Sequence, residues 1–143
     1  MSRNSSYFKG ERFNALAKKE GFRSRAAYKL IQIQKDFKLI KSGDNILDLG
    51  SAPGGWSQVA SNILNGSGSI IAIDLLPMKK ITNVDFHQLD LNDIDKINLR
   101  EISIVLSDIA PNISGVNIID DENMIALLEI EISIVDKFLQ IGG

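Results

Sequence analysis

Short apolar runs alternate with longer amphipathic segments along this chain. Four runs predict strands, at residues 46–49, 69–74, 84–89 and 102–106. Apolar residues recur at helical spacing in three segments that predict helices, at residues 22–37, 56–64 and 122–139. Strands that alternate with helices are typical of an α/β fold with a parallel sheet, and we expect the first and fourth strands to be neighbours.

Two of the predicted helices carry an apolar stripe. In the first, Ser24 is the expected N-cap, and the stripe consists of Ala26, Leu30, Ile33 and Phe37. In the last, the stripe expected to face the core consists of Ile125, Leu128, Ile132, Val135 and Leu139. Residues 1–21 predict an irregular, mobile and basic N-terminal arm.

The sequence ends shortly after the last predicted helix. Four strands make about half of a larger doubly wound sheet, and the fourth strand would remain an exposed hydrophobic edge. We therefore expect residues 22–143 to be the N-terminal portion of a single domain, truncated after the fourth strand and its helix.

A glycine-rich turn follows the first strand, in the sequence NILDLGSAPGGWS from Asn45 to Ser57. Glycines let a ligand approach the backbone, and a helix N-terminus presents unpaired N–H groups. The glycines at 50, 54 and 55 do not fit the G-x-G-x-x-G spacing, and Trp56 stands where a phosphate-binding loop has lysine. The turn contains no basic residue, so it favours a nucleoside without phosphate, such as S-adenosylmethionine. The alternative is an ordinary turn whose glycines serve geometry alone.

Three acidic residues follow predicted strands. Asp74 ends the second strand some twenty residues after the glycine turn, where an acid can bind ribose hydroxyls or cap the next turn. Asp90 follows the third strand, and it either meets an adenine amino group or caps a helix. Asp108 follows the fourth strand, at the edge where open α/β sheets bind ligands.

The composition narrows the class of protein. The 143 residues suit one domain with a hydrophobic core. The chain has no cysteine, which excludes disulfides and thiol nucleophiles and suits a reducing compartment. No apolar run is long enough to span a bilayer, so we expect a cytoplasmic protein without a membrane contact. The basic, serine-containing N-terminus leaves organelle targeting open.

Charge is distributed unevenly along the chain. Residues 1–41 contain eleven Lys and Arg against three acidic residues, a net charge of +8, and the rest carries −10. Arg23, Arg25 and Lys29 lie near the start of the first predicted helix, where cations oppose the helix dipole. Because local stability does not explain them, we expect these three residues to contact the phosphates of a nucleic acid, which the resemblance described below implies is RNA. The alternative is a solvated tail.

Aromatic residues accompany the basic ones in the arm. Tyr7, Phe8 and Phe13 interleave with lysines and arginines. Such rings stack on bases in single-stranded nucleic acid, or they anchor an arm to the body of a protein.

Four ordered motifs resemble the RrmJ/FtsJ family of ribosomal RNA 2′-O-ribose methyltransferases. They are SRAAYKL at 24–30, DLGSAPGGWSQ at 48–58, AIDLLPM at 72–78 and SDIAPNISG at 107–115. The resemblance is greatest to the bacterial enzymes that methylate a uridine of large-subunit ribosomal RNA. It implies a Rossmann-like, S-adenosylmethionine-dependent methyltransferase fold, and ribosomal RNA or the large ribosomal subunit as partner.

The resemblance also implies roles for individual residues. The cofactor-binding set would be Gly54, Gly55, Trp56, Asp74, Asp90 and Asp108, with Gly54 and Trp56 at the methionine end and Asp74 and Asp90 at the adenosine. Of the family's catalytic Lys-Asp-Lys-Glu set, Lys29 matches the first lysine and Asp108 the aspartate. The second lysine and the glutamate have no counterpart in residues 1–143. The resemblance implies no metal, and we expect a monomer.

Two other readings stay open from the sequence. One is a non-catalytic RNA- or ribosome-binding module that retains the S-adenosylmethionine pocket. The other is a nicotinamide dehydrogenase, which the spacing of the glycines disfavours.

Overall fold

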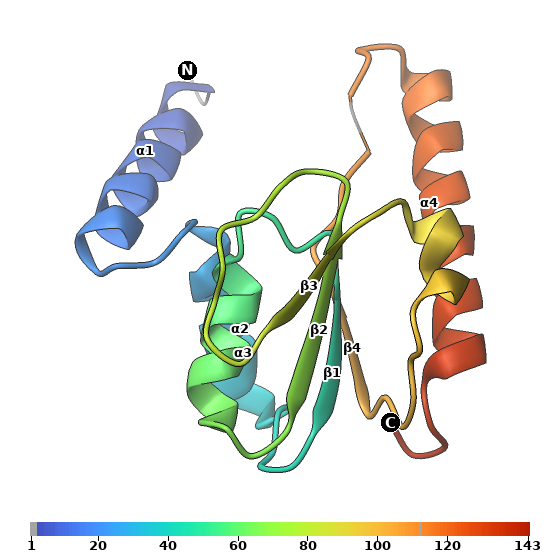
Figure 1. Cartoon of the computed structure of the whole chain (residues 1–143). Helices are drawn as coiled ribbons and strands as arrows, with labels where there is room; N and C mark the ends of the chain where they lie inside the picture. Colours follow the sequence, from blue (N-terminus) through green and yellow to red (C-terminus); the bar gives the residue numbers. More distant parts are fainter. Residues whose placement is uncertain (1–2, 112) are drawn as a thin grey trace.

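A computed structural model of the chain describes residues 3–111 and 113–143, and it contains one parallel sheet. The strands are β1 (Asn45–Leu49), β2 (Ser69–Asp74), β3 (Asp85–Gln88) and β4 (Ile104–Ser107). Their order in space is β3-β2-β1-β4 (Figure 1). The predicted strands and the predicted pairing of the first and fourth are therefore confirmed.

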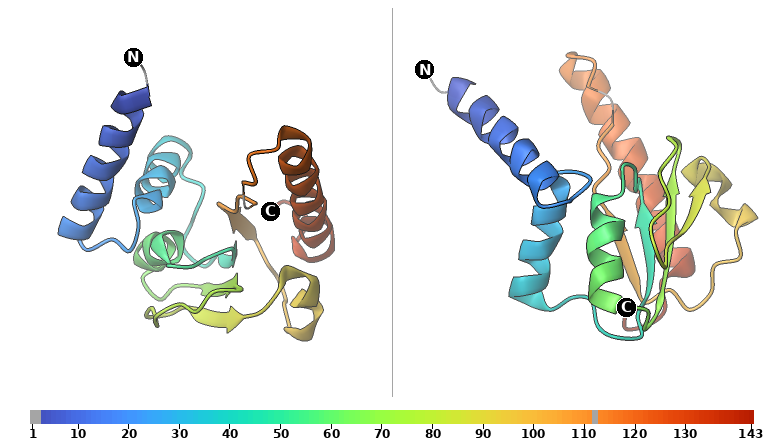
Figure 2. Two further views of the ribbon diagram at one scale, coloured as in Figure 1. Left: turned by 90° about the horizontal axis from the view of Figure 1, so that it is seen from above. Right: turned by 60° about the vertical axis from the view of Figure 1, so that its left-hand side comes forward.

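Helices cover both faces of this sheet. One layer contains α2 (Ala26–Phe37) and α3 (Gly55–Leu64), and the other contains the 3-10 helix η1 (Leu91–Lys96) and α4 (Asn117–Phe138) (Figures 1 and 2). Alternate residues of β1 supply the two cores, because neighbouring side chains of a strand point to opposite faces. Ile46 packs with α2 and α3, whereas Leu47 and Leu49 pack with Ile94 and Ile134.

The N-terminal arm differs from the prediction. Residues 3–19 form helix α1 (Arg3–Lys19) and are not irregular, and residues 1 and 2 of the predicted arm lie outside the described residues. Ala17 is 2% exposed and its carbonyl accepts a bond from the N–H of Phe22, so the end of α1 is anchored to the body. Gly21 then turns the chain with a φ of 82°.

The start of α2 also differs from the prediction. The helix begins at Ala26 and not at residue 22, because the intervening segment is held elsewhere: the N–H of Arg23 donates to Oε1 of Gln58 at 3.1 Å. Arg25 is the N-cap in place of the predicted Ser24, and it makes no side-chain cap bond.

Helix α4 buries a different face from the one predicted. Of the predicted stripe, Leu139 packs against the core, but Ile125, Leu128, Ile132 and Val135 are exposed. The face toward the sheet holds Ile130, Ile134 and Phe138. The helix carries apolar residues on both sides, so periodicity alone selected the wrong one. It also begins five residues earlier than predicted, at Asn117. No helix of the described residues is sufficiently long and apolar to cross a membrane.

Candidate active site

The carboxyl ends of β1, β2 and β4 meet at one edge of the sheet. Leu49 is in register with Ile73 on one side and with Ser107 on the other, so Gly50, Asp74 and Asp108 leave the sheet together. The turn after β1 is tied to β2, because the N–H of Gly50 donates to the carbonyl of Ile73 at 2.8 Å.

Asp74 fixes the glycine-rich turn from the end of β2. One carboxylate oxygen accepts from the N–H of Ala52 at 2.9 Å, and the other accepts from the N–H of Leu76 at 2.8 Å. The capping alternative is therefore present in the structure. Since each carboxylate oxygen has a second lone pair, these bonds leave Asp74 able to accept from a ligand as well.

A cavity of about 750 Å³ opens beside this edge. Its polar side chains include Asp74, Asp90 and Asp108, and its apolar lining includes Leu89 and Ile130. A second cavity, of about 300 Å³, is lined by Asp48, Ser51 and Trp56 among others. Both cavities include Gly50 and Asp108, so the acidic residues and Trp56 border two adjoining recesses.

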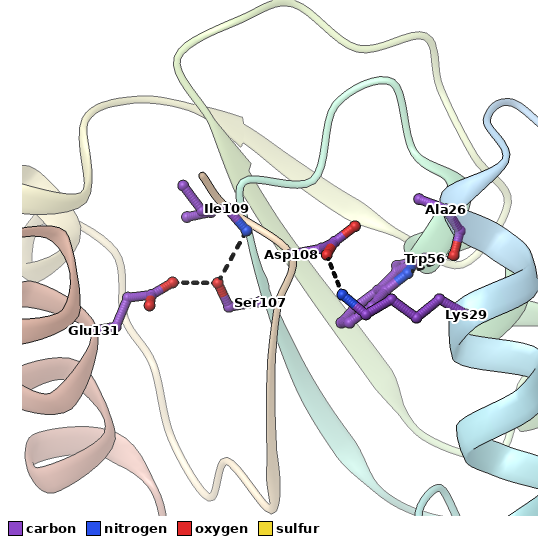
Figure 3. A network of polar contacts seen from close by, with 7 residues as sticks. All are labelled: Ala26, Lys29, Trp56, Ser107, Asp108, Ile109 and Glu131. Carbon is purple, nitrogen blue, oxygen red and sulfur yellow. Dashed lines mark hydrogen bonds and ion pairs between the residues drawn. The ribbon is translucent and has the colours of Figure 1, made fainter. Parts of the chain in front are cut away.

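Asp108, which lines both recesses, forms an ion pair with Lys29. Nζ of Lys29 on α2 lies 2.8 Å from Oδ1 of Asp108, and their side chains are 62% and 35% exposed (Figure 3). The same ammonium lies 5.7 Å from the ring centroid of Trp56, which favours a cation over that face. The ammonium is thus held in place and still accessible to a ligand.

The segment that carries Asp108 is held from the other layer. Ser107 Oγ contacts Oε1 of Glu131 on α4, and the N–H of Ile109 donates to the same hydroxyl at 3.4 Å (Figure 3). Ser107 and Ile109 flank Asp108, so α4 fixes the direction in which this carboxylate leaves β4.

Asp48 is a functional candidate that the sequence reasoning missed. It is 2% exposed and lines the smaller cavity. Ser57 Oγ donates to its carboxylate at 2.6 Å. Burial raises the pKa of Asp48 to about 7; the Ser57 bond opposes the shift, and nearby Asp74 and Asp108 add to it. The available signal was an acid inside the otherwise apolar run ILDL.

A family model described as FtsJ-like methyltransferase matches residues 22–143. The chain belongs to the FtsJ-like methyltransferase family.

Curated relatives of this family member carry the name ribosomal RNA large subunit methyltransferase E. The Coxiella burnetii protein is 44% identical over 138 residues, which are 89% of this chain and 65% of that protein. The Pseudomonas fluorescens protein is 41% identical over 134 residues, which are 89% of this chain and 64% of that protein. This chain therefore spans less than two thirds of the relatives' length.

A solved structure shares the fold of this family member. It is a ribosomal RNA methyltransferase from Plasmodium falciparum, 31% identical, and the match covers 83% of this chain and 73% of that one with a TM-score of 0.75.

The predicted glycines of this FtsJ-like chain have separate positions. Gly54 is the N-cap of α3, with a φ of 113°, and a Cβ there would lie 2.7 Å from Ile81, away from the cavity lining. Gly55 lines the smaller cavity, and a Cβ there would lie 2.3 Å from Oγ of Ser24. Trp56 is 8% exposed because it packs in the core beside α2, and its Nε1 donates to the carbonyl of Ala26 at 2.8 Å.

The two predicted RNA-binding arginines of this family member differ in what they contact. The guanidinium of Arg23 donates to the carbonyls of Pro53, Lys79 and Lys80 at 3.3, 2.5 and 2.7 Å, so it ties two loops together. Arg25 lines the smaller cavity instead. RNA contact by either residue stays a prediction.

Asp90 caps a helix, which is one of its two predicted roles. It is the N-cap of η1, with Oδ1 accepting from the N–H of Asn92 at 2.8 Å, and it also lines the larger cavity. Nδ2 of Asn92 donates to the same oxygen at 2.8 Å, so Oδ1 already accepts two bonds. Adenine recognition by Asp90 stays a prediction.

Proposed function

We propose that the protein takes part in the S-adenosylmethionine-dependent 2′-O-methylation of large-subunit ribosomal RNA, at the ribose of a uridine. The observation that carries this proposal is the contact of Lys29, at 2.8 Å, with Asp108, which lines both cavities. A cofactor in the recesses and a ribose at the accessible ammonium would meet at this pair. The names of the curated relatives support ribosomal RNA as the substrate class.

The chemistry of the cavities fits S-adenosylmethionine. Among the buried side-chain atoms that the structure describes, Ser51 Oγ alone lacks a hydrogen-bond partner, and Ser51 lines the smaller cavity. The amino and carboxyl groups of a methionine moiety would satisfy such a hydroxyl. Asp74 and Asp90 supply acceptors for ribose hydroxyls and an adenine amino group in the larger cavity. When bound, S-adenosylmethionine supplies a methyl group on a positively charged sulfur.

Carboxylates around the recesses suit a positively charged ligand. Asp48, Asp74 and Asp108 all line one or both cavities, and the turn between β1 and α3 contains no basic residue. A cation placed there offsets the mutual repulsion of these carboxylates, whereas a polyphosphate increases it. This distribution favours S-adenosylmethionine over a dinucleotide.

Lys29 and Asp108 would position the ribose. A 2′-hydroxyl is a weak nucleophile, so its proton must leave as the oxygen attacks. The Lys29 ammonium can donate to the hydroxyl oxygen and orient it, while Asp108 fixes the ammonium at 2.8 Å. The family resemblance assigns proton removal to a second lysine that has no counterpart in residues 1–143.

Basic side chains of the N-terminal segment would also bind ribosomal RNA. We propose that the protein does so as a monomer in the cytoplasm. The +8 charge of residues 1–41 includes five basic residues in α1, and phosphates are their natural counter-charge. Among the described residues, no group of three or more His, Asp or Glu side chains could hold a metal, and the proposal assigns none.

Two measurements test this function. First, S-adenosylmethionine should raise the melting temperature of the protein and NAD should not, because a ligand that binds the folded state stabilises it. Second, the protein should transfer labelled methyl groups from S-adenosylmethionine to ribosomal RNA, at a site that then resists alkaline cleavage. Binding of cofactor and RNA without transfer would instead support a non-catalytic RNA-binding module. Stabilisation by NAD and not by S-adenosylmethionine would contradict the proposal.

A further inference from the structure

A third cavity lies between α1 and α2 and reaches the Lys29–Asp108 pair. Its volume is about 490 Å³, and besides that pair its lining includes Lys9, Phe13, Arg25 and Tyr28. It shares Arg25 and Asp108 with the smaller of the two recesses described above. Figures 1 and 2 show α1 standing beyond the sheet on the side of α2.

One wall of this α1–α2 cavity is aromatic. The rings of Phe13 and Tyr28 are 6.0 Å apart, and Phe13 is 49% exposed. Tyr28 is held in place by an edge contact with Phe22 at 5.4 Å and by a bond from its hydroxyl to Glu20. A fixed aromatic pair with one accessible ring is the kind of surface on which a nucleic-acid base stacks.

Another wall of the cavity is basic. Lys9 and Arg25 line it, and the ion pairs found among the described residues include neither of them. Gly10 lies inside α1, where glycine lowers helix stability by comparison with alanine. A Cβ at Gly10 would lie 2.4 Å from Nη1 of Arg25, so the glycine leaves room for the guanidinium beside α1. Two unpaired cations in one recess favour a phosphate.

The three parts of a nucleotide match the three walls of this cavity. Its base and its phosphate diverge from the ribose, and the cavity offers an aromatic wall, a basic wall and the Lys29–Asp108 pair. We propose that the α1–α2 cavity is the subsite for the nucleotide to be methylated, with the base against Phe13, the phosphate at Arg25 and Lys9, and the 2′-hydroxyl at Lys29. This inference rests on the proposed function and adds where the substrate nucleotide lies.

Basic and aromatic side chains also line the outer surface of α1. A shallow cavity of about 650 Å³ shares Lys9 and Phe13 with the α1–α2 cavity and also includes Arg12 and Lys19. Neighbouring nucleotides of a strand would therefore meet further cations along α1. Stacking on aromatic rings combined with phosphate contacts binds single strands with little dependence on their sequence.

The test compares a five-residue oligouridylate with the same ribose-phosphate chain lacking its bases. Fluorescence anisotropy would measure the affinity of the complete protein for both probes. We expect Phe13→Leu to weaken oligouridylate binding about 10-fold and to leave abasic binding unchanged, because leucine keeps apolar contact and loses the stacking face. Phe13→Tyr keeps the ring and should bind as the unchanged protein does. Phe37→Leu is the matched control, since Phe37 is 76% exposed at the far end of α2.

A second variant tests the basic wall and does not depend on Phe13. Arg25→Gln should lower the affinity for both probes equally and reduce the magnitude of the slope of log affinity against log salt by about 1. The subsite proposal would be overturned if Phe13→Leu lost affinity equally for both probes, or if Phe13→Leu and Arg25→Gln both bound the probes as the unchanged protein does. The shift in melting temperature with S-adenosylmethionine, measured on the same samples, should not change in Phe13→Leu, because Phe13 lines neither of the two recesses assigned to the cofactor. If the unchanged protein shows no such shift, the proposed function fails, whereas the comparison of the two probes still decides the subsite.

Discussion

The ammonium of Lys29 lies 2.8 Å from Oδ1 of Asp108, although 79 positions separate the two residues in the sequence. Lys29 comes from the second helix, and Asp108 comes from the loop after the last strand. Their contact joins α2 to the carboxyl edge of the sheet, next to Trp56. A pair with side chains 62% and 35% exposed adds little stability, so its role is better sought in the positioning of a ligand.

Asp108→Asn tests that role. We expect methyl transfer to fall roughly 100-fold or more, because the Lys29 ammonium loses the group that fixes it. The free energy of unfolding should change by less than about 1 kcal/mol, since the pair is accessible to water. Transfer assays and denaturant unfolding would measure the two effects.

The control for Asp108→Asn is Asp95→Asn. It breaks another exposed ion pair, in which Nζ of Lys137 lies 2.5 Å from Oδ1 of Asp95. This variant should keep full transfer activity. Normal turnover in Asp108→Asn would show that the reaction centre lies elsewhere.

Asp48 should make stability depend on pH. Its pKa is about 7 in the folded protein against an ordinary value of 3.8, so the folded state binds the extra proton between these values. The stability associated with that proton is complete below pH 3.8 and is lost as the pH rises to about 7. The loss amounts to at most about 4 kcal/mol, at 1.36 kcal/mol for each pKa unit.

Asp48→Asn removes this titration. Denaturant unfolding between pH 4 and 8 should show the variant gaining stability relative to the unchanged protein as pH rises, because asparagine stays neutral and can still accept from Ser57. Asp36→Asn, at an exposed position on α2, should show no such gain. A constant difference between Asp48→Asn and the unchanged protein would contradict the raised pKa.

Gly50→Ala tests the close packing of the turn against the loop that carries Asp108. Gly50 has a φ of 68°, and a Cβ there would lie 2.1 Å from Cγ1 of Ile109. We expect destabilisation of about 1 to 3 kcal/mol and loss of the melting-temperature shift with S-adenosylmethionine, since a shift of the Ile109 backbone to relieve the contact would displace the adjacent Asp108. Calorimetry with and without the ligand would measure both.

Gly115→Ala is the control for Gly50→Ala, because it introduces the backbone strain of a positive φ without a steric clash. Gly115 also has a positive φ, of 88°, but a Cβ there would meet nothing within 4 Å. This variant should lose some stability and keep the ligand-induced shift. Equal behaviour of the two variants would mean that the contact with Ile109 does not position the site.

The structure bears out the sequence predictions where they rest on local rules. The run Ser69–Asp74 is β2, and the glycine turn after β1 leads into α3 as predicted. In parallel strands all carboxyl ends lie at one edge, so the strand assignments were sufficient to bring Asp74 and Asp108 to the same cavity.

Other features required contacts between distant segments. Apolar residues occur on both sides of α4, and packing on the sheet decides that Ile134 is buried while Ile132 is exposed. Arg23 and Arg25 look equivalent in sequence, yet one donates to loop carbonyls and the other lines two cavities.

The sequence by itself determined the alternation of strands and helices, the position of the glycine turn, and which acids follow a strand. Those features depend on side-chain periodicity and on backbone rules that act over a few residues. The tertiary structure decided that Lys29 meets Asp108, that Asp48 is desolvated, and that α1 and α2 form a cavity lined by Phe13. Each of these depends on the distance between segments far apart in the chain, because desolvation and ion pairing are set by what surrounds a group in space.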